Sequence, residues 1–133
     1  MFKLSIVTPE KIFYEGEVSS IIVPGSQGYL GVLTDHAPLI TSIIPGKLTV
    51  KDESHKEIIL AVSFGFFEVS SNHATLLADS VEFASDLDLE RARKALERSK
   101  KRLSDIAGNI DLPRARRAYE RAQSRLRILD SLE

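Results

Sequence analysis

Phe83-Ala-Ser-Asp-Leu-Asp-Leu-Glu-Arg-Ala92 is the stretch at which the pattern of this 133-residue chain changes. Before it, short β-branched runs alternate with turn residues, which is typical of antiparallel strands. After it, apolar residues recur every three or four positions, which is typical of one face of a helix. The sequence therefore predicts an α+β protein in two parts, residues 1–84 and residues 85–133.

The charged residues divide at the same place. Up to residue 84, five lysines stand against ten acidic residues, for a net charge of −5; from residue 85, thirteen basic residues stand against nine acidic ones, for +4. All ten arginines lie at or beyond Arg91, whereas six of the seven glycines lie at or before Gly65. An acidic, glycine-punctuated domain is therefore followed by a basic, helix-forming one.

The first part predicts an antiparallel β-sandwich of about ten strands. So many short strands must close into a sandwich or a flattened barrel, because one open sheet of that size would leave an apolar face in water. The sandwich is the favoured of the two. Turn residues such as Pro24-Gly25, Pro45-Gly46 and Ser71-Asn72 separate the strands. The expected strands are 3–8, 11–15, 18–23, 29–33, 39–43, 47–51, 57–62, 65–70 and 74–78.

The second part predicts two antiparallel helices, because only the short link 107–111 separates two apolar stripes. Each stripe has a 3-4-3-4-3 spacing that is typical of a helix-helix seam. The stripes are Leu89, Ala92, Leu96, Ser99, Leu103 and Ile106 in the first helix, and Leu112, Ala115, Tyr119, Ala122, Leu126 and Leu129 in the second.

Polar residues mark the ends of these helices. Ser85, Asp86 or Asp88 is expected to cap the first helix, Gly108 to end it, and Asp111 to cap the second. The seam between the helices is narrow and rich in small residues, so an isolated hairpin of this kind is close to marginal in stability. We expect it to dock on the outer face of the β domain and to be able to leave it, as a conformational switch does.

The chemistry that an enzyme needs is missing from the sequence. There is no cysteine, and His36, His55 and His73 have no partner at the spacing of metal ligands. Gly25-Ser-Gln-Gly-Tyr-Leu-Gly31 lacks the spacing and the following helix of a phosphate-binding loop, so it is interpreted as a turn. No apolar run reaches the roughly 20 residues that span a bilayer, and the amino terminus has the pattern of a strand rather than of a signal peptide.

Arginine dominates the charge of the helical part. Its planar guanidinium binds carboxylates and phosphates in a bidentate manner, so an anionic partner is a better explanation than solubility for ten arginines against three lysines. For each arginine taken singly, a solvated helix face remains the simpler interpretation. Nucleic acid is the weakest of the anionic candidates, because the helices carry a single aromatic residue, Tyr119, which belongs to the seam.

Four stretches together resemble the epsilon subunit of bacterial and chloroplast F-type ATP synthases. That resemblance extends over essentially the whole chain and implies a sandwich followed by a two-helix hairpin. The stretches are Leu4-Ser-Ile-Val-Thr-Pro9, Gly28-Tyr-Leu-Gly-Val-Leu-Thr-Asp-His-Ala-Pro-Leu-Ile-Thr41, Ala61-Val-Ser-Phe-Gly-Phe-Phe-Glu-Val69 and Ala74-Thr-Leu-Leu-Ala-Asp79.

The resemblance implies a non-catalytic rotor subunit of the central stalk, which helps couple proton flow to ATP synthesis. Its sandwich would bind the gamma subunit and rest on the membrane-embedded rotor ring. The loop that follows residue 30 would supply contacts with gamma or the ring, although its proline and apolar residues equally well shape a turn. The residues implied are Gly31, Val32, Leu33, His36 and Pro38.

The chain departs from the family pattern at three places near these contacts. Tyr29 stands where glutamate is common, Thr34-Asp35 replaces a frequent Pro-Gly, and Phe64 stands where glycine is usual. These departures leave the expected fold unchanged and concern the individual contacts with gamma or the ring.

The family's hairpin can extend along gamma into the catalytic head, meet the alpha and beta subunits, and oppose ATP hydrolysis. The resemblance further implies association with a membrane only through the complex, at the cytoplasmic face of a bacterial membrane or the stromal face of a thylakoid. It implies no nucleic-acid partner and no required cofactor.

Some family members bind ATP as a regulatory ligand through an (Ile/Leu)-Asp-x-x-Arg-Ala motif in the docked hairpin. Leu87, Asp88, Arg91 and Ala92 match that motif, and Glu82, Arg121 and Arg125 occupy the other matching places. Arg121 and Arg125 lie one turn apart and can clamp phosphate, while Asp88 and Glu82 can accept hydrogen bonds from the adenine amino group or the ribose. The alternative is that Asp88 only caps a helix and both arginines bind carboxylates.

A second function remains open from the residues alone. The chain would then be a stand-alone regulatory β-sandwich with a basic helical hairpin that binds an acidic protein or nucleic acid. Formation of a stoichiometric complex with gamma separates the first function from this one.

Overall fold

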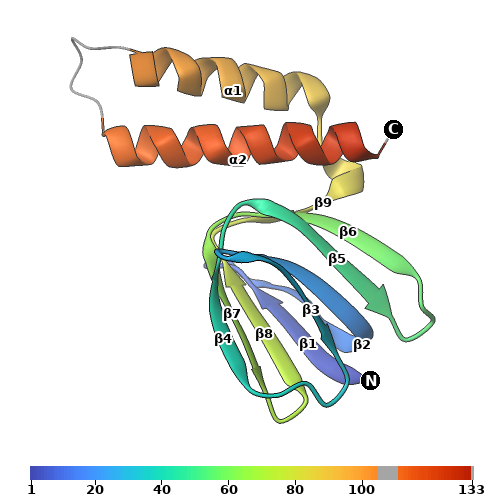
Figure 1. The fold of residues 1–133 in the computed structure, drawn as a ribbon. Helices are drawn as coiled ribbons and strands as arrows, with labels where there is room; N and C mark the ends of the chain where they lie inside the picture. The colour runs from blue at the N-terminus through green and yellow to red at the C-terminus, as the bar shows by residue number, and fades with distance from the viewer. Residues whose placement is uncertain (105–110, 133) are drawn as a thin grey trace. The chain divides into compact units, whose positions relative to one another are not determined.

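The computed structural model describes residues 1–104 and 111–132 of the chain. Contacts between Cα atoms divide it into two compact units, Met1–Phe83 and Ala84–Glu133 (Figure 1). The first unit contains only strands and the second only helices. The nine strands are β1 (Phe2–Val7), β2 (Ile12–Gly25), β3 (Gly28–Leu33), β4 (Leu39–Ile43), β5 (Gly46–Asp52), β6 (Glu57–Val62), β7 (Gly65–Ser70), β8 (His73–Ala78) and β9 (Val81–Phe83).

The strands form one sheet that folds back on itself. Their order is β1-β8-β7-β4-β2-β5-β6-β9, β3 pairs with β2, and an additional pairing joins β1 to β2. Because β2 pairs with β1 along its first half and with β3 and β5 along its second, it belongs to both layers of the sandwich (Figure 1). The strands β1 and β8 run parallel, and the other pairs are antiparallel.

Alternation along the strands fills the space between the layers. In β1, for example, Phe2, Leu4 and Ile6 point inward and are at most 2% exposed, as the two-residue period of a strand requires. Phe67 on β7 and Leu76 on β8 join the same core cluster. Full burial of such a side chain contributes roughly 1.5–3 kcal/mol, so this core supplies the main stabilisation of the first unit.

The predicted sandwich is confirmed, with nine strands in place of about ten. Two of the expected strands, 11–15 and 18–23, are one continuous strand β2, because Gly16 pairs with Leu4 of β1 instead of turning the chain. The short strand β9 was not expected. Its three residues pair with β6, but they are too few to show alternation in the sequence.

The second unit is an antiparallel pair of helices, α1 (Leu89–Ser104) and α2 (Leu112–Ser131), preceded by a 3₁₀ turn at Ala84–Asp86 (Figure 1). Of the three residues expected to cap the first helix, Asp88 does so: its Oδ1 accepts a hydrogen bond from the Arg91 backbone N–H at 3.1 Å. Asp111 caps α2 in the same way through the Arg114 N–H. The expected helix end at Gly108 lies outside the described residues.

Small residues make the seam between the helices. The seam positions Ala92, Ser99, Ala115 and Ala122 are all at most 5% exposed, and the Ser99 hydroxyl donates to the Ala95 carbonyl oxygen at 2.8 Å. The larger seam residues Leu96, Leu103, Tyr119, Leu126 and Leu129 are half-buried. The seam is therefore closely spaced but buries little apolar area.

Two expected seam residues are instead exposed. Leu89 is 40% and Leu112 is 51% exposed. Each is the first residue of its helix, and helical side chains lean toward the helix N-terminus, so these two reach beyond the end of the seam. Ile106, also expected in the stripe, lies outside the described residues.

Tyr14 gives the first unit a predictable response to alkaline pH. Burial, and then the negative charges of Asp52 and Glu53, raise the pKa of Tyr14 above the model value of 10.0. Folding therefore favours the protonated phenol, and the folded chain binds more protons than the unfolded chain above about pH 10. The contribution is fully present below that pH and is lost as pH rises through the folded pKa.

We expect Tyr14→Phe to reduce the loss of unfolding free energy between about pH 9 and about pH 11, measured by urea titration. Tyr29→Phe is the control, because the Tyr29 ring is 60% exposed. An identical pH dependence in Tyr14→Phe and in the unmutated chain would contradict the prediction.

Candidate functional sites

The residues expected to contact gamma or the ring divide between surface and core. Gly31, Leu33 and Pro38 are exposed and His36 is half-buried. Val32 is 1% exposed and belongs to the core cluster, so its side chain anchors β3 and contributes no contact surface. A Cβ atom added at Gly31 would meet no atom within 4 Å. The sandwich itself therefore does not require glycine at this position.

Hydrogen bonds fix the loop that carries His36. Asp35 adopts a left-handed conformation, with φ of 63°, and its backbone N–H donates to Asn72 Oδ1 at 2.8 Å. His36 Nδ1 lies 2.7 Å from the Ala37 carbonyl oxygen. Sequence reasoning had interpreted Asn72 only as a turn residue, and it missed this contact because the partner is 37 residues away.

Tyr29 holds the other end of the same segment. Its Oη accepts a hydrogen bond from the Lys47 N–H at 3.2 Å, although its ring is exposed. Gly46 leaves room for this arrangement, because a Cβ atom there would lie 2.6 Å from Pro24 Cβ and 3.0 Å from Tyr29 Oη. We call residues 28–38, which both bonds hold, the contact segment.

An apolar strip lies on the outer face of β4, β7 and β8. It consists of Ile40, Phe66 and Leu77, which are 70%, 59% and 49% exposed. Phe66 and Leu77 are direct partners across the β7–β8 pair, and Ile40 lies diagonally across from Phe66 because it pairs with Glu68. Exposed apolar clusters of this kind are typical of protein interfaces.

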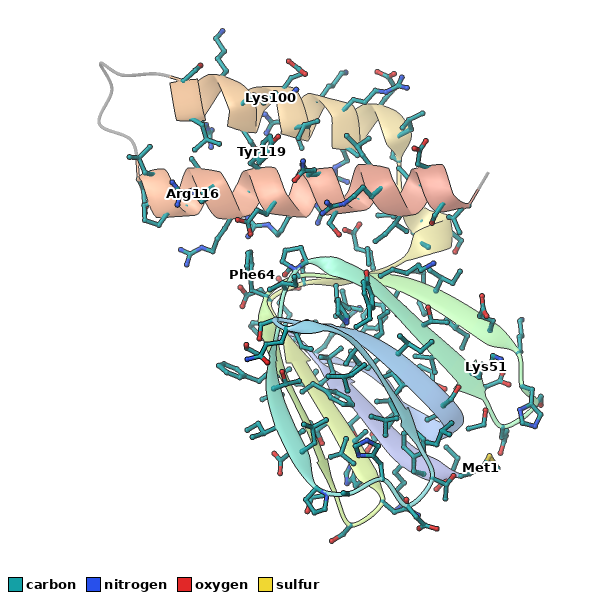
Figure 2. All side chains as sticks on the ribbon, in the orientation of Figure 1. Met1, Lys51, Phe64, Lys100, Arg116 and Tyr119 are labelled. Carbon is teal, nitrogen blue, oxygen red and sulfur yellow. The ribbon has the colours of Figure 1, made fainter. Side chains whose placement is uncertain are left out.

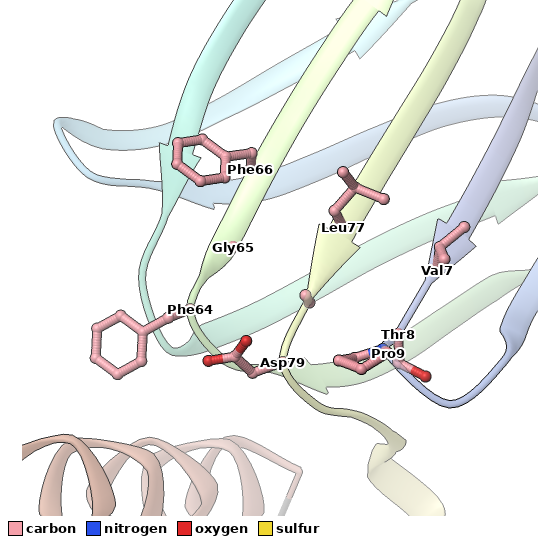
Figure 3. A pocket seen from close by; sticks show the side chains of 9 residues that line it. Val7, Thr8, Pro9, Phe64, Gly65, Phe66, Leu77 and Asp79 are labelled. Carbon is pink, nitrogen blue, oxygen red and sulfur yellow. The ribbon is translucent and has the colours of Figure 1, made fainter. Parts of the chain in front are cut away.

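A pocket of about 480 Å³ adjoins this strip (Figure 3). It opens where β1 and β8 end and β7 begins, and the Asp79 carboxylate lies at one side of it (Figure 3). Its lining residues are Val7, Thr8, Pro9, Phe64, Gly65, Phe66, Leu77, Ala78 and Asp79. The strip and the pocket form one continuous apolar surface, since they share Phe66 and Leu77.

The Leu-Asp-x-x-Arg-Ala motif forms the start of α1. Asp88 caps the helix, Arg91 supplies the capped N–H and is itself exposed, and Ala92 is buried in the seam at 4% exposure. The Leu87 N–H donates to the Ala84 carbonyl oxygen at 3.2 Å. Each motif residue thus has a structural role, and the cap occupies only part of the accepting capacity of the Asp88 carboxylate.

The other predicted nucleotide residues lie on α2 and β9. Arg121 and Arg125 are half-buried and one turn apart on α2, whose C-terminal half runs beside the start of α1 (Figure 1). The structure therefore brings Asp88 and Arg91 near one another at the start of α1, and it brings the two arginines together on α2. Glu82 lies on β9, where it pairs with Ala61.

A groove of about 630 Å³ lies between the start of α1 and the end of α2. Its lining residues are Leu89, Arg93, Gln123, Leu126, Arg127, Leu129, Asp130 and Leu132. None of the predicted nucleotide residues lines this groove. Figure 2 shows basic side chains along both helices, among them Lys100 and Arg116.

Two classes of site are absent from the described residues, 1–104 and 111–132. No group of three or more histidine, cysteine, aspartate or glutamate side chains there could hold a metal ion. No helix among those residues is long and apolar enough to cross a membrane.

Comparison with known proteins assigns both units. Residues 1–84 match the model of the ATP synthase delta/epsilon chain β-sandwich domain, and residues 85–130 match that of the delta/epsilon chain long α-helix domain. The chain belongs to the ATP synthase delta/epsilon chain family. Together the two matches cover nearly its whole length.

Curated relatives show that the chain is of the epsilon type. It is 43% identical to the ATP synthase epsilon chain of Protochlamydia amoebophila over 103 residues, which cover 77% of this chain and 70% of that one. It is 44% identical to that of Moorella thermoacetica over 102 residues, which cover 77% and 76%. The epsilon chain of Desulfosudis oleivorans is 45% identical over 101 residues, covering 76% of each.

Solved structures support the fold. A chain of the Euglena gracilis mitochondrial ATP synthase assembly of OSCP, F1 and c-ring matches with a TM-score of 0.82 at 20% identity, covering 98% of this chain and 80% of that chain. A chain of the Tetrahymena thermophila central stalk and c-ring assembly matches with a TM-score of 0.57 at 14% identity, covering 98% and 94%.

The cap on α1 makes a prediction that separates its structural role from ligand binding. Asp88→Ala should destabilise α1 by about 1 kcal/mol, because the Arg91 N–H loses its acceptor, and Asp88→Asn should retain most of this stability. Hydrogen exchange of the α1 amides measures the effect, with Asp86→Ala as the control in the preceding turn. Equal protection in Asp88→Ala and the unmutated chain would refute the capping role.

Proposed function

We propose that the chain is a non-catalytic rotor subunit in the central stalk of an F-type ATP synthase, where it helps couple proton flow to ATP synthesis. The observation that carries this proposal is that both units match the two domains of one family, in the order and at the boundary of that family. No observation favours the alternative of a stand-alone regulatory sandwich that binds an acidic protein or nucleic acid.

The gamma subunit is the proposed partner of the apolar strip. A side chain such as Ile40, which is 70% exposed, gains free energy when a partner covers it. Phe66 supplies an aromatic anchor, a residue type that is enriched in interface cores. The neighbouring pocket extends the same surface and can receive an apolar side chain of gamma.

We expect the purified chain to form a stoichiometric complex with its gamma subunit, and Ile40→Ser to lower the affinity about tenfold, because apolar area is lost from the interface. Titration calorimetry measures both. Ile22→Ser is the matched control, since Ile22 is also exposed, at 43%, but lies on β2 away from the strip. If gamma bound Ile40→Ser and the unmutated chain equally, the strip would not be the gamma surface. A steep salt dependence of binding to polyanions, without a gamma complex, would favour the nucleic-acid alternative.

The contact segment is proposed to rest on the rotor ring. Gamma and the ring need separate surfaces, and the segment lies on the β2–β3 pair, whereas the strip lies on β4, β7 and β8. Gly31 supports this assignment, because nothing within the sandwich requires glycine there and a partner backbone can approach it closely. Leu33 adds an apolar side chain that is 66% exposed.

The hairpin is proposed to inhibit ATP hydrolysis when it extends along gamma and reaches the alpha and beta subunits. Its net charge of +4 from residue 85 onward favours an acidic partner surface. The ion pairs in its first helix, Arg93–Glu90 at 3.6 Å and Lys100–Glu97 at 3.8 Å, are solvent-exposed. Such pairs contribute little stability, so they oppose a change of partner only weakly.

ATP is the proposed regulatory ligand of the docked hairpin. Arg121 and Arg125 would bind its phosphates, and Asp88 and Glu82 would accept hydrogen bonds from the adenine or the ribose. The spacing of the two arginines on one face of α2 supports a clamp of this kind. Leu87, Arg91 and Ala92 would shape the start of α1 around the nucleotide.

We expect Arg121→Ala and Arg125→Ala each to weaken ATP binding by about 1.5–3 kcal/mol, the scale of a charged hydrogen bond. Calorimetric titration with ATP, and with GTP as the competing nucleotide, measures this. Arg116→Ala is the control, because Arg116 is an exposed arginine of the same helix. Unchanged affinity in both variants would remove the clamp and leave the arginines to bind carboxylates.

The proposed location follows from the partners. The chain would attach to the membrane only through gamma and the ring, at the cytoplasmic face of a bacterial membrane or the stromal face of a thylakoid. It would require no cofactor and bind no nucleic acid.

A further inference from the structure

We infer that Tyr29 and Asn72 are positioning residues that hold the contact segment, residues 28–38, in the conformation that binds the rotor ring. This inference rests on the proposed function of that segment. It concerns two residues that make no assumed contact with the ring themselves and act through the backbone conformation that they stabilise.

The segment needs external support because part of it is strained. Asp35 has φ of 63°, a left-handed conformation that costs a residue other than glycine free energy. The loop from Thr34 to Pro38 follows the end of β3, where no strand pairing holds it. In the described first unit, the side-chain hydrogen bond to the Asp35 backbone comes from Asn72, at 2.8 Å.

Asn72 is itself held firmly. It lies in the two-residue turn between β7 and β8, flanked by the pair Ser70 and His73, and its carbonyl oxygen accepts a hydrogen bond from the Lys3 N–H at 3.2 Å. Its φ of 60° suits asparagine, which tolerates the left-handed region better than most residues. The turn therefore presents Oδ1 at a fixed place for the Asp35 N–H.

Tyr29 braces the opposite end of the segment. Its partner on β2 is Pro24, which has no N–H to donate, and the Tyr29 hydroxyl reaches across to accept from the Lys47 N–H at 3.2 Å. This bond links the start of β3 to β5. The two braces thus tie the segment to β5 at one end and to the β7–β8 turn at the other.

Preorganisation of this kind increases affinity by removing the cost of ordering a loop on binding. When only a fraction of molecules has the competent conformation, the apparent Kd rises by the inverse of that fraction. Loss of one hydrogen bond changes such an equilibrium by about tenfold. The effect should appear mainly in the association rate, which falls when binding requires a conformational change.

Asn72→Gly is the sharpest variant. Glycine adopts φ of 60° without strain, so the turn is kept while the acceptor is lost. Ser71→Gly is the matched control, because Ser71 is the other left-handed residue of the turn, with φ of 49°, and its side chain does not hold Asp35. Asn72→Asp retains an acceptor oxygen and should behave as the unmutated chain. For the second brace, Tyr29→Phe removes the hydroxyl alone, with Tyr14→Phe as its control.

The experiment has two readouts on the full chain. Hydrogen exchange of the Asp35 amide reports the brace, and binding of the preassembled gamma complex to detergent-solubilised rotor ring reports its use. We expect Asn72→Gly to accelerate Asp35 exchange about tenfold and to slow association with the ring by about three- to tenfold. Ser71→Gly and Asn72→Asp should change neither, and the melting temperatures of all variants should be similar.

Each result has a distinct meaning. Unchanged exchange in Asn72→Gly, or faster exchange with unchanged association, would overturn the inference while leaving the ring contact intact. Failure of the unmutated complex to bind the ring would refute the proposed function of the segment, and with it the role of both braces in binding.

Discussion

The continuity of β2 is the constraint on which the sandwich depends. This one strand of 14 residues pairs with β1 in its first half, with β3 and β5 in its second, and with β4 at Gly25. A strand shared between two layers must bend, and register shifts between Val18 and Ser20 and between Ile6 and Val7 accompany the change of partners. The closed sheet leaves the apolar strip and the contact segment on separate strands, which is what two different partners require.

The sequence predicted the architecture well, because both periodicities are long and unambiguous. It placed the change from strands to helices at Phe83-Ala84, where the contacts also divide the chain. It placed both caps, since aspartate before an apolar stripe is a strong local signal. It divided β2 at Gly16 because a glycine inside a strand and a glycine in a turn are the same letter, and only the pairing with Leu4 separates them.

The candidate site was less accessible to sequence reasoning. Long-range contacts have no local signature, so neither the bond from Asp35 to Asn72 nor the one from Lys47 to Tyr29 could be derived from spacing. Val32 illustrates a related limit, because alternation identifies two faces of a strand and leaves open which face is inward. The nucleotide motif was visible as a pattern, but the structure gives Asp88 and Ala92 roles in folding as well. A pattern that serves a helix start and a ligand together cannot be assigned to one of them by its letters.

Energetics limit what a nucleotide can do to this hairpin. A ligand present at about 100 times its Kd stabilises the state that binds it by about 2.7 kcal/mol, whereas moving a two-state equilibrium from 1:99 to 99:1 takes about 5.5 kcal/mol. ATP alone would therefore shift, but not fully reverse, the balance between docked and extended hairpins. The remainder must come from contacts of the helices with protein surfaces. The small seam residues Ala92, Ser99, Ala115 and Ala122 keep the pair thin and its own stability low, so exchange of one protein surface for another governs the switch and nucleotide adjusts it.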